Sequence, residues 1–360
     1  MKHYGIAGAG LTGAIIGREL AERGHQVTIY DQRAHVAGNC HTERVKGIMV
    51  HRYGPHIFHT DNEQVWAYVN RFAEFRPVRL KVISEVFNQH YSFPINLLTM
   101  CQVYGQQMPP STAQMLIDRD CVFTSFPRNF EEAALSTVGK TLYKMFYKGY
   151  TEKQWGRSAK ELPASVFKRI PVRMTHDDNY FYHKYQAIPV QGYTALVENI
   201  LDHKNIALHL NEPFDRMRYY DHTIWTGTID SFFDYQLGAL PYRSLQFRDE
   251  EKEGDAQGCH TVNCPDPQTP YTRRVEHKHF TPWEQHRNTI VTYEYSVEWG
   301  PGMIEYYPIR LADEEELLAQ YINLAHSVPN VTFAGRLGQY KYMDMDVTIA
   351  EALKLSKQIK

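Results

Sequence analysis

Three glycines near the start of the chain have the spacing of a phosphate-binding turn. Gly8, Gly10 and Gly13 follow a short apolar segment, residues 4–7, and a helical pattern begins directly after them and covers residues 11–23. Glycines permit a tight turn and a close approach of the backbone to a pyrophosphate, and the first turn of a helix presents free N–H groups with a partial positive charge. This part of the sequence therefore predicts a dinucleotide-binding unit of strand, turn and helix.

An acidic residue completes this pattern. A second strand is expected over residues 26–30, and Asp31 follows it, where a carboxylate can accept a hydrogen bond from a ribose hydroxyl. The alternative is a tightly packed strand–helix turn that binds nothing. The following residues, 32–39, resemble the continuation of this motif in flavoproteins with two dinucleotide-binding segments, except that Ala37 replaces the first of two glycines.

The histidines and cysteines form no recognisable site by themselves. His56 and His59 are three residues apart without further clustered ligands, which is an incomplete metal site, so no metal is predicted. The cysteines are odd in number, scattered and free of any CxxC motif, which is typical of reduced thiols in a cytosolic protein. They are Cys40, Cys101, Cys121, Cys259 and Cys264.

Length and charge limit the classes of protein to consider. The chain has 360 residues, which suggests two or three domains at roughly 100–200 residues each. Its formal net charge of −2 gives no support for nucleic acid or an anionic membrane as a partner. No stretch approaches the ~18 apolar residues of a membrane span, and no signal segment is evident, so we expect a cytoplasmic protein. The 25 tyrosines favour either ordinary packing or an aromatic-lined cleft.

The order of the helices and strands expected along the chain predicts a mixed α/β (α+β) fold with three domains. A discontinuous Rossmann-like dinucleotide-binding domain is expected over residues 1–80, 194–235 and 310–360. A helical bundle domain is expected over 96–175, and an antiparallel-sheet substrate domain over 81–95, 176–193 and 236–309. In the sheet domain we expect a turn at Asn88-Gln89, and we expect the charged run at 248–258 to be a solvated loop.

Several longer segments identify a family. Together they resemble the bacterial UDP-galactopyranose mutases over almost the whole chain. The segments are Tyr53–Thr60, Lys148–Gly156, Lys168–Arg173, Pro270–Arg273, Glu276–His279, Tyr306–Pro308 and Gly335–Asp346.

The resemblance implies a flavoenzyme that uses reduced FAD without net redox chemistry. In that family the flavin N5 attacks the anomeric carbon, the nucleoside diphosphate leaves, and the opened sugar closes through a different hydroxyl to give the furanose. The chain would then be an isomerase whose partner is a nucleotide-diphosphate sugar, and it would supply a cell-surface polysaccharide such as O-antigen. It must hold the flavin, stabilise the leaving diphosphate and keep that group nearby.

Matching positions imply a substrate site. Arg169 and Arg273 stand where the family has its two phosphate-binding arginines, and guanidinium groups suit phosphate oxygens. Three tyrosines match hydrogen-bond donors to the same oxygens: Tyr180, Tyr307 and Tyr342. The remaining positions match contacts to the nucleotide or the sugar: Phe146, Tyr150, Thr151, Trp155, Asn263 and His59.

The resemblance also implies a set of flavin contacts. It places His56 beside the isoalloxazine ring, where it counts with the two arginines among the catalytic residues. It places a helix N-terminus over residues 343–348 against the cofactor. The full set is Gly8, Gly10, Thr12, Gly13, Asp31, Gln32, Asn39, His56, Ile57, Phe214, Arg336, Met343, Asp344, Met345, Asp346, Val347 and Thr348.

Three departures from the family pattern bear on the sugar. Ala187 replaces a usual glycine, Thr228 replaces a usual proline, and Leu80 replaces an asparagine that lies at the sugar in galactose-type members. An asparagine can bond a sugar hydroxyl and a leucine cannot, so Leu80 favours a 6-deoxy sugar, as in the dTDP-fucopyranose mutases of the same family. The other interpretation is that Leu80 only tunes packing and that the substrate is UDP-galactopyranose.

Two other classes of protein remain open at this stage. One is an FAD-dependent amine or sugar oxidase on the same fold, and the other is a catalytically inactive protein that binds nucleotide sugars. Bacterial members of the family are commonly dimers, so a homodimer is also expected.

Overall fold

The computed structural model describes residues 1–169, 172–309 and 312–359, with the backbone alone at 168, 169 and 312–314. The chain forms two compact units, which are described separately below. Unit 1 comprises Met1–Val78, His183–Tyr242 and Ala312–Lys360, and unit 2 comprises Arg79–Tyr182 and Arg243–Leu311. The three-domain boundaries expected from the sequence stay a prediction.

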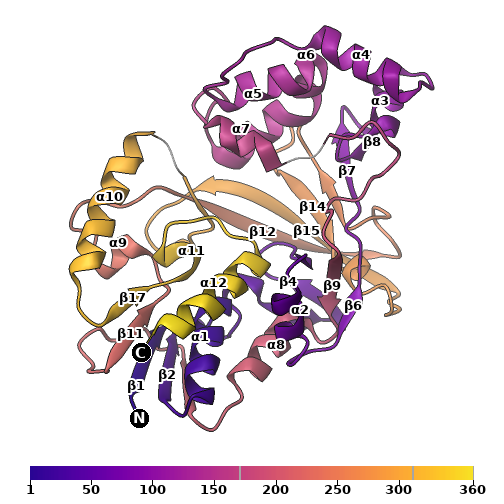
Figure 1. Cartoon of the computed structure of the whole chain (residues 1–360). Coiled ribbons are helices and arrows are strands. Elements are labelled where there is room, and N and C mark those ends of the chain that lie inside the picture. Colours follow the sequence, from indigo (N-terminus) through magenta and orange to yellow (C-terminus); the bar gives the residue numbers. More distant parts are fainter. Residues whose placement is uncertain (170–171, 310–311, 360) are drawn as a thin grey trace. The chain divides into compact units, whose positions relative to one another are not determined.

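A five-stranded parallel sheet forms the centre of unit 1, with the strand order β10-β2-β1-β11-β17 (Figure 1). It joins strands from both ends of the chain, because β1 pairs with β11, and β11 pairs on its other side with β17. Its strands are β1 His3–Ala7, β2 Gln26–Asp31, β10 Ile206–Leu210, β11 His222–Trp225 and β17 Val331–Phe333. The strands predicted near residues 4–7, 26–30 and 331–333 are thereby confirmed.

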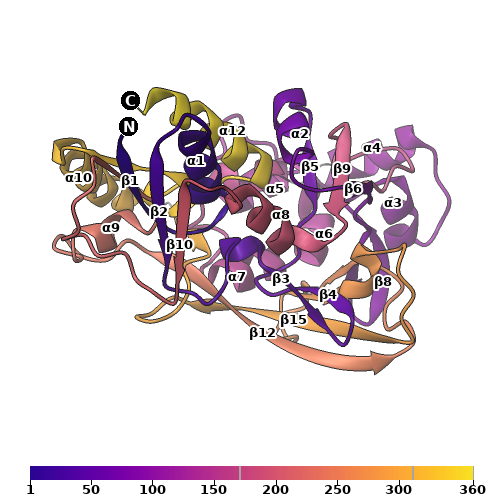
Figure 2. The ribbon, with the colours of Figure 1, turned by 90° about the horizontal axis from the view of Figure 1, so that it is seen from below.

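The first and last long helices of unit 1 lie side by side in Figures 1 and 2. α1 (Leu11–Glu22) approaches the sheet closely at Gly17, where a Cβ would lie 2.8 Å from Cδ1 of Ile29. α12 (Met345–Gln358) covers α1. The other helices are α2 Glu63–Val69, α8 Gly192–Leu201, α9 Ile229–Phe232, α10 Ala312–Ser327 and α11 Gly335–Gly338, with a short 3-10 turn η1 at Gly38–Cys40. Two small sheets complete the unit: β3 Thr42–Val45 with β4 Ile48–His51, and β5 Phe58–Thr60, β9 Tyr185–Pro189 and β6 Phe75–Pro77.

Unit 2 contains a seven-stranded sheet in the order β16-β12-β15-β14-β13-β7-β8. Its strands are β7 Val82–Val86, β8 Gln89–Phe93, β12 Tyr242–Glu253, β13 Thr261–Asn263, β14 Arg273–Glu276, β15 Asn288–Glu298 and β16 Tyr307–Pro308. Figure 2 shows β12 and β15 as a long antiparallel ribbon. A 3-10 turn, η4, covers His277–Phe280.

Two sequence-based expectations for this sheet were wrong in detail. The charged run at 248–253 belongs to β12 and pairs with β15, because an antiparallel ribbon can leave one face to water and place charged side chains there. The turn of the β7–β8 hairpin lies at Phe87-Asn88, one residue earlier than expected. Both residues have positive φ, 50° and 59°, as a type I′ turn requires.

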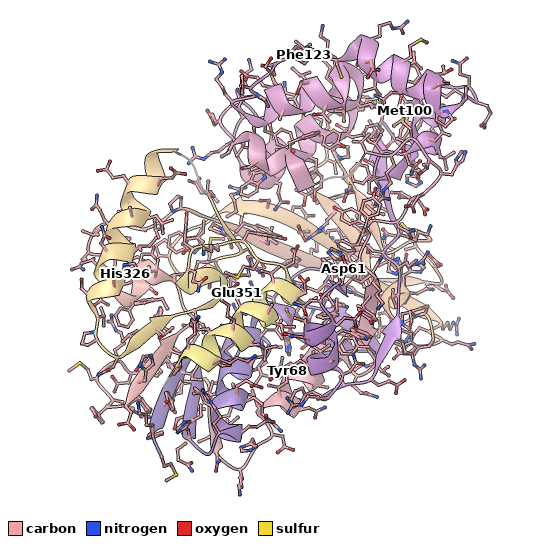
Figure 3. The ribbon with its side chains drawn as sticks, in the orientation of Figure 1. Asp61, Tyr68, Met100, Phe123, His326 and Glu351 are labelled. Atoms are coloured by element: carbon pink, nitrogen blue, oxygen red, sulfur yellow. The ribbon has the colours of Figure 1, made fainter. Side chains whose placement is uncertain are left out.

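The helical part of unit 2 is a series of short helices. Residues 129–168, whose sequence pattern predicts helices, are divided at Gly139 and Gly156, whose φ values of +77° and +65° end a right-handed helix. Figure 3 shows Met100 on α3, where its side chain is fully buried, and Phe123 in the loop after α4, where it is 85% exposed. The helices are α3 Leu97–Tyr104, α4 Pro110–Asp120, α5 Phe130–Thr137, α6 Gly139–Leu142, the π-helical η2 Tyr143–Lys148, α7 Gly149–Trp155 and the 3-10 segment η3 Ala164–Arg169. Among the described residues, no helix combines the length and apolarity that crossing a membrane requires.

Candidate functional site

The glycine turn of unit 1 leaves space for a ligand at one position only of the three. A Cβ on Gly8 would lie 2.1 Å from Oγ1 of Thr226, and a Cβ on Gly13 would lie 2.0 Å from the carbonyl oxygen of Gly8. These two glycines therefore permit close packing of α1 on the sheet. A Cβ on Gly10 would meet only Gly38, at 3.8 Å, so this glycine keeps the backbone open to an approaching group.

The start of α1 offers hydrogen-bond donors beside Gly10. Gly10 is the N-cap, no described side chain caps the helix, and its first turn carries no acidic residue. The free N–H groups and the helix dipole therefore favour an anion there, as a pyrophosphate requires. Thr12 is buried in this turn, and Gly335 lies against it, since a Cβ on Gly335 would be 2.7 Å from Oγ1 of Thr12. The neighbouring Arg336 is thereby brought to the turn.

The carboxylate of Asp31 is already bonded to backbone amides. Its Oδ2 accepts from the N–H of Ala9 at 2.8 Å, and its Oδ1 accepts from the N–H of Arg33 at 2.9 Å. A carboxylate has about four lone-pair sites, so it can still accept a ribose hydroxyl. Gln32, beside it, is exposed. Asp31 thus fixes the glycine turn and keeps capacity for a ligand.

Ala37 adopts a conformation that normally favours glycine. Its φ is +72°, its side chain is buried, and its N–H donates to the carbonyl of Ala9 at 2.9 Å. Gly38 follows with φ of +53°. Asn39 accepts from Arg33 at 3.0 Å, which fixes the segment at the glycine turn.

We expect Ala37→Gly to stabilise the protein by about 0.5–1 kcal/mol. An L-residue in the left-handed region costs about 1–2 kcal/mol, and the greater freedom of glycine in the unfolded chain offsets part of the gain. Thermal unfolding of the flavin-free protein measures the change. Ala34→Gly, at an exposed position without positive φ, is the control and should lower Tm; equal losses for the two variants would contradict the prediction.

A group of histidines follows β4 in unit 1. His56 pairs its Nδ1 with the carbonyl of Gly54 at 2.8 Å, and Ile57 beside it is buried. His59 is buried and its ring lies 4.6 Å from that of His183. Burial lowers the pKa of His59; Asp344 opposes the shift and His183 adds to it. His59 is therefore uncharged at neutral pH.

The C-terminal segment of unit 1 carries the remaining predicted flavin contacts except Phe214. The helix N-terminus predicted over 343–348 is present, since α12 begins at Met345 with Asp344 as its N-cap, followed by Asp346, Val347 and Thr348. The guanidinium of Arg336 lies 5.5 Å from the ring centre of Tyr342, which is 41% exposed, and Met343 is buried. Phe214 contacts Tyr30 edge to face at 5.6 Å.

In unit 2, the predicted residues Asn263 and Arg273 lie in one row across the sheet with Glu294, which was not predicted. Asn263 is the direct partner of Arg273 between β13 and β14, and Arg273 is the direct partner of Glu294 between β14 and β15. Directly opposed residues share a face of the sheet. The Nε and Nη2 atoms of Arg273 donate to Oε2 of Glu294 at 2.8 and 2.7 Å. The guanidinium is therefore held in one orientation.

Phenol groups surround this pair. Burial alone would lower the pKa of Arg273, but Glu294, with smaller contributions from Tyr150 and Tyr307, raises it well above its ordinary value. Burial raises the pKa of Tyr150, and Tyr180 also contributes to this shift. Arg273 is thus a permanent cation among neutral phenols, an arrangement that suits an anionic group with several oxygens.

α7 and its neighbours carry the other predicted substrate contacts. Thr151 is buried on α7, and the ring of Trp155 lies 6.3 Å from that of Tyr307. Phe146 lies in the apolar core, with its ring 5.4 Å from Tyr91. Leu80 is half-buried and packs, like Tyr180 and Trp155, against the edge of this core. The side chain of Arg169 lies outside the described residues.

Sequence reasoning missed Glu294. Its carboxylate is fully buried, and its Oε1 has no hydrogen-bond partner among the described residues. The only signal was an acidic residue inside a strand pattern, and this does not reveal that the neighbouring strand brings an arginine opposite. Glu294 thus positions the guanidinium of Arg273, which is predicted to bind phosphate.

Asp255, Glu276 and His279 come close enough to suggest a metal site, but their bonds indicate a structural network. Glu276 accepts from the backbone N–H groups of Ala256 and Gln257 at 3.0 and 2.8 Å. Burial would raise the pKa of Glu276, but hydrogen bonds from His279 and these amides lower it to about 2. The cluster therefore fixes the turn after β12.

Comparison with known proteins gives the family. A family model described as UDP-galactopyranose mutase matches residues 145–342, and a model of an NAD(P)-binding Rossmann-like domain matches residues 6–72. The chain is 48% identical to a probable UDP-galactopyranose mutase of Klebsiella pneumoniae, over 99% of this chain and 94% of that protein. The chain belongs to the UDP-galactopyranose mutase family. It is also 44% identical to the dTDP-fucopyranose mutase of Escherichia coli, over 98% of this chain and 97% of that protein.

Solved structures agree on the fold of this UDP-galactopyranose mutase family member. The crystal structure of a reduced UDP-galactopyranose mutase superposes with a TM-score of 0.79 at 14% identity, covering 100% of this chain and 95% of that one. A putrescine oxidase variant superposes with a TM-score of 0.62 at 10% identity, covering 99% and 98%. The predicted family and the mixed α/β fold with a Rossmann-like domain are confirmed. The oxidase shares the fold, so the fold alone does not decide the reaction.

Proposed function

We propose that this protein interconverts the pyranose and furanose forms of a galacto-configured hexose carried by a nucleoside diphosphate, with reduced FAD as its cofactor and no net redox change. The names of two relatives support this, since one is a probable UDP-galactopyranose mutase and the other a dTDP-fucopyranose mutase. The observation that carries the proposal is the guanidinium of Arg273, which Glu294 fixes and whose charge interacts with the phenols of Tyr150 and Tyr307.

The residues of unit 1 fit an FAD. The backbone at Gly10 is open, the start of α1 presents free N–H groups, and Asp31 has capacity for a ribose hydroxyl. His56 and the N-terminus of α12 are the proposed neighbours of the flavin ring. When bound in reduced form, FAD supplies the nucleophile for the anomeric carbon of the sugar.

The residues of unit 2 have the chemistry to hold a departing diphosphate. The anomeric C–O bond breaks with its electron pair on the phosphate oxygen, so negative charge increases there. Arg273 stabilises this charge without changing its protonation state, and tyrosine hydroxyls donate hydrogen bonds without adding charge. Arg169 is proposed as the second cation. Retention of the diphosphate permits its return after the sugar ring has closed through another hydroxyl.

A flavin-dependent oxidase is the competing function, because putrescine oxidase has the same fold. An oxidase reduces its flavin with the substrate and passes the electrons to oxygen, and an arginine among phenols has no role in that reaction. The dithionite-reduced protein should convert nucleotide hexopyranose to furanose, as chromatography measures, without oxygen uptake or peroxide. Oxygen-dependent product formation would favour the oxidase, and nucleotide binding without conversion would favour an inactive binding protein.

Leu80 supports a 6-deoxy sugar as the preferred substrate. Its side chain joins the edge of an apolar core beside Tyr180 and Trp155, and it offers no hydrogen bond. A sugar hydroxyl buried against leucine loses its partner, which costs roughly 1–3 kcal/mol, whereas a methyl group gains on the order of 0.8 kcal/mol.

We expect Leu80→Asn to shift preference toward galactose. The ratio of kcat/KM for UDP-galactopyranose over dTDP-fucopyranose should rise about tenfold or more, since one restored hydrogen bond is worth about 1.4 kcal/mol. Matched assays of both donors measure the ratio. Leu98→Asn, at an exposed position on α3, should leave it unchanged. A wild-type preference for UDP-galactopyranose would contradict the role proposed for Leu80.

The remaining parts of the proposal rest on the family and the composition. A cytoplasmic homodimer without a nucleic-acid partner is proposed. Light scattering of the purified protein tests the dimer.

A further inference from the structure

The ammonium group of Lys153 lies among four backbone carbonyls of one loop. Lys153 is on α7, and its Nζ donates to the carbonyl oxygens of Cys264, Asp266, Thr269 and Tyr271 at 2.5, 2.9, 2.8 and 3.0 Å. All four acceptors belong to residues 264–271, which form all but the last residue of the connection between β13 and β14. An ammonium has three hydrogens, so this loop provides more acceptors than the group needs.

The loop connects two proposed substrate contacts. It begins directly after Asn263, the last residue of β13, and ends before Arg273, the first residue of β14. The bond to Cys264 holds the first residue of the loop, and the bond to Tyr271 holds the loop two residues before Arg273. Lys153 therefore closes the loop at both ends.

α7 is fixed against the same part of the unit along its length. At its start, a Cβ on Gly149 would lie 2.1 Å from the carbonyl oxygen of Pro265, so the helix and the loop touch backbone to backbone. At its end, Nε of Arg243 donates to the carbonyl of Gln154 at 3.1 Å. Gly156 leaves room for Arg243, because a Cβ at position 156 would lie 2.4 Å from Nη1 of that arginine.

We propose that Lys153 is the positioning residue that aligns the nucleotide-binding side chains of α7 with Asn263 and Arg273. This inference rests on the proposed function, which places Tyr150, Thr151 and Trp155 at the nucleotide. The ammonium acts through the 264–271 loop and contacts neither the sugar nor the cofactor. Loss of this alignment should therefore weaken nucleotide binding and leave the reacting groups in place.

The charged form of Lys153 is the one that matters at neutral pH. Burial lowers its pKa to about 8, which leaves the ammonium predominant at pH 7. Its three hydrogens can then satisfy carbonyls whose oxygens converge on one point, and these carbonyls would repel one another without a cation between them.

The first experiment compares Lys153→Met with Lys144→Met, an exposed lysine of η2. For Lys153→Met, KM and the UDP dissociation constant should each rise about tenfold or more, while kcat changes by less than about threefold, because binding geometry is lost and the reacting groups remain. Amide hydrogen exchange should show faster exchange confined to residues 263–273. Lys144→Met should alter neither quantity.

Chemical rescue separates the bonds from the charge. In Lys153→Ala, propylammonium should restore the low KM, since it supplies the deleted chain and three N–H donors. Tetramethylammonium, which has the charge but no N–H, should not. Equal rescue by both cations, or unchanged KM and exchange in Lys153→Met, would overturn the proposal.

Two results keep this proposal apart from the proposed function. If the wild-type protein binds neither UDP nor dTDP, the proposed function fails, and the exchange experiment still reports whether Lys153 holds the loop. If Lys153→Met does not fold, Lys153→Arg replaces it, because a guanidinium keeps the charge while its planar donors match converging carbonyls less well. An unchanged KM with a loosened loop in that variant would again overturn the proposal.

Discussion

Arg273→Met is expected to lower kcat/KM by about 10³-fold, since removing one preorganised donor to developing charge costs about 10²–10³ in rate and a cation contributes more than a neutral donor. The guanidinium is held in one orientation by two bonds to Glu294, so it is preorganised for the diphosphate. Steady-state kinetics with the dithionite-reduced enzyme measure this loss. A decrease of less than about tenfold would contradict a role for Arg273 at the diphosphate.

The control for Arg273 must separate activity from folding. Arg273→Met leaves Glu294 as a buried, unpaired carboxylate, and breaking such a pair destabilises a protein by about 3–5 kcal/mol. Adding Glu294→Gln removes that charge, so the double variant should regain most of its stability in denaturant titrations. Its kcat/KM should stay as low as that of the single variant.

Gly10→Ala is expected to weaken FAD binding by about 10²-fold while the protein keeps its fold, since a methyl group at a close backbone contact removes about 2.7 kcal/mol of affinity. Gly10 has φ of −76°, which alanine adopts freely, and its new Cβ would meet no atom closer than 3.8 Å. The substitution should therefore weaken FAD binding without destabilising the protein. Flavin fluorescence on titration of the flavin-free protein measures the dissociation constant.

Two further glycine variants are the controls for Gly10→Ala. Gly300→Ala, where a Cβ would meet only the sulfur of Met303 at 3.9 Å, should change neither FAD affinity nor Tm. Gly13→Ala should unfold the protein or lower its Tm strongly, because its Cβ would lie 2.0 Å from the carbonyl of Gly8. If Gly10→Ala lowers Tm like Gly13→Ala, the open space at Gly10 is not a ligand site.

The glycine turn could be predicted from the sequence because its three glycines are spaced within one strand–turn–helix unit, which short-range spacing is sufficient to identify. Only Gly13 has its close contact inside that unit, with the carbonyl of Gly8, whereas Gly8 lies against the side chain of Thr226. The helix N-terminus at Met345 was implied by the family resemblance. The family resemblance supplied the other candidate residues, and the comparisons confirm the family while the residue roles stay predictions.

The Arg273–Glu294 pair and the bonds of Lys153 could not be predicted in this way. The first depends on the register of two strands, which tertiary packing sets. The bonds of Lys153 use backbone carbonyls as acceptors. Every residue has such a carbonyl, so the residue types of the loop do not reveal these bonds. The charged strand of β12 was taken for a loop because charge alone indicates exposure, and both a loop and the open face of a ribbon are exposed.

The interleaving of both chain ends in the parallel sheet of unit 1 has a consequence for biosynthesis. While the ribosome is still translating, β11 is an unpaired edge and α1 has no α12 to cover it, since β17 and α12 emerge last. The nascent chain must therefore keep this half open, in reach of chaperones, until translation ends. The proposed flavin site of unit 1 is therefore complete only after β17 and α12 have been made.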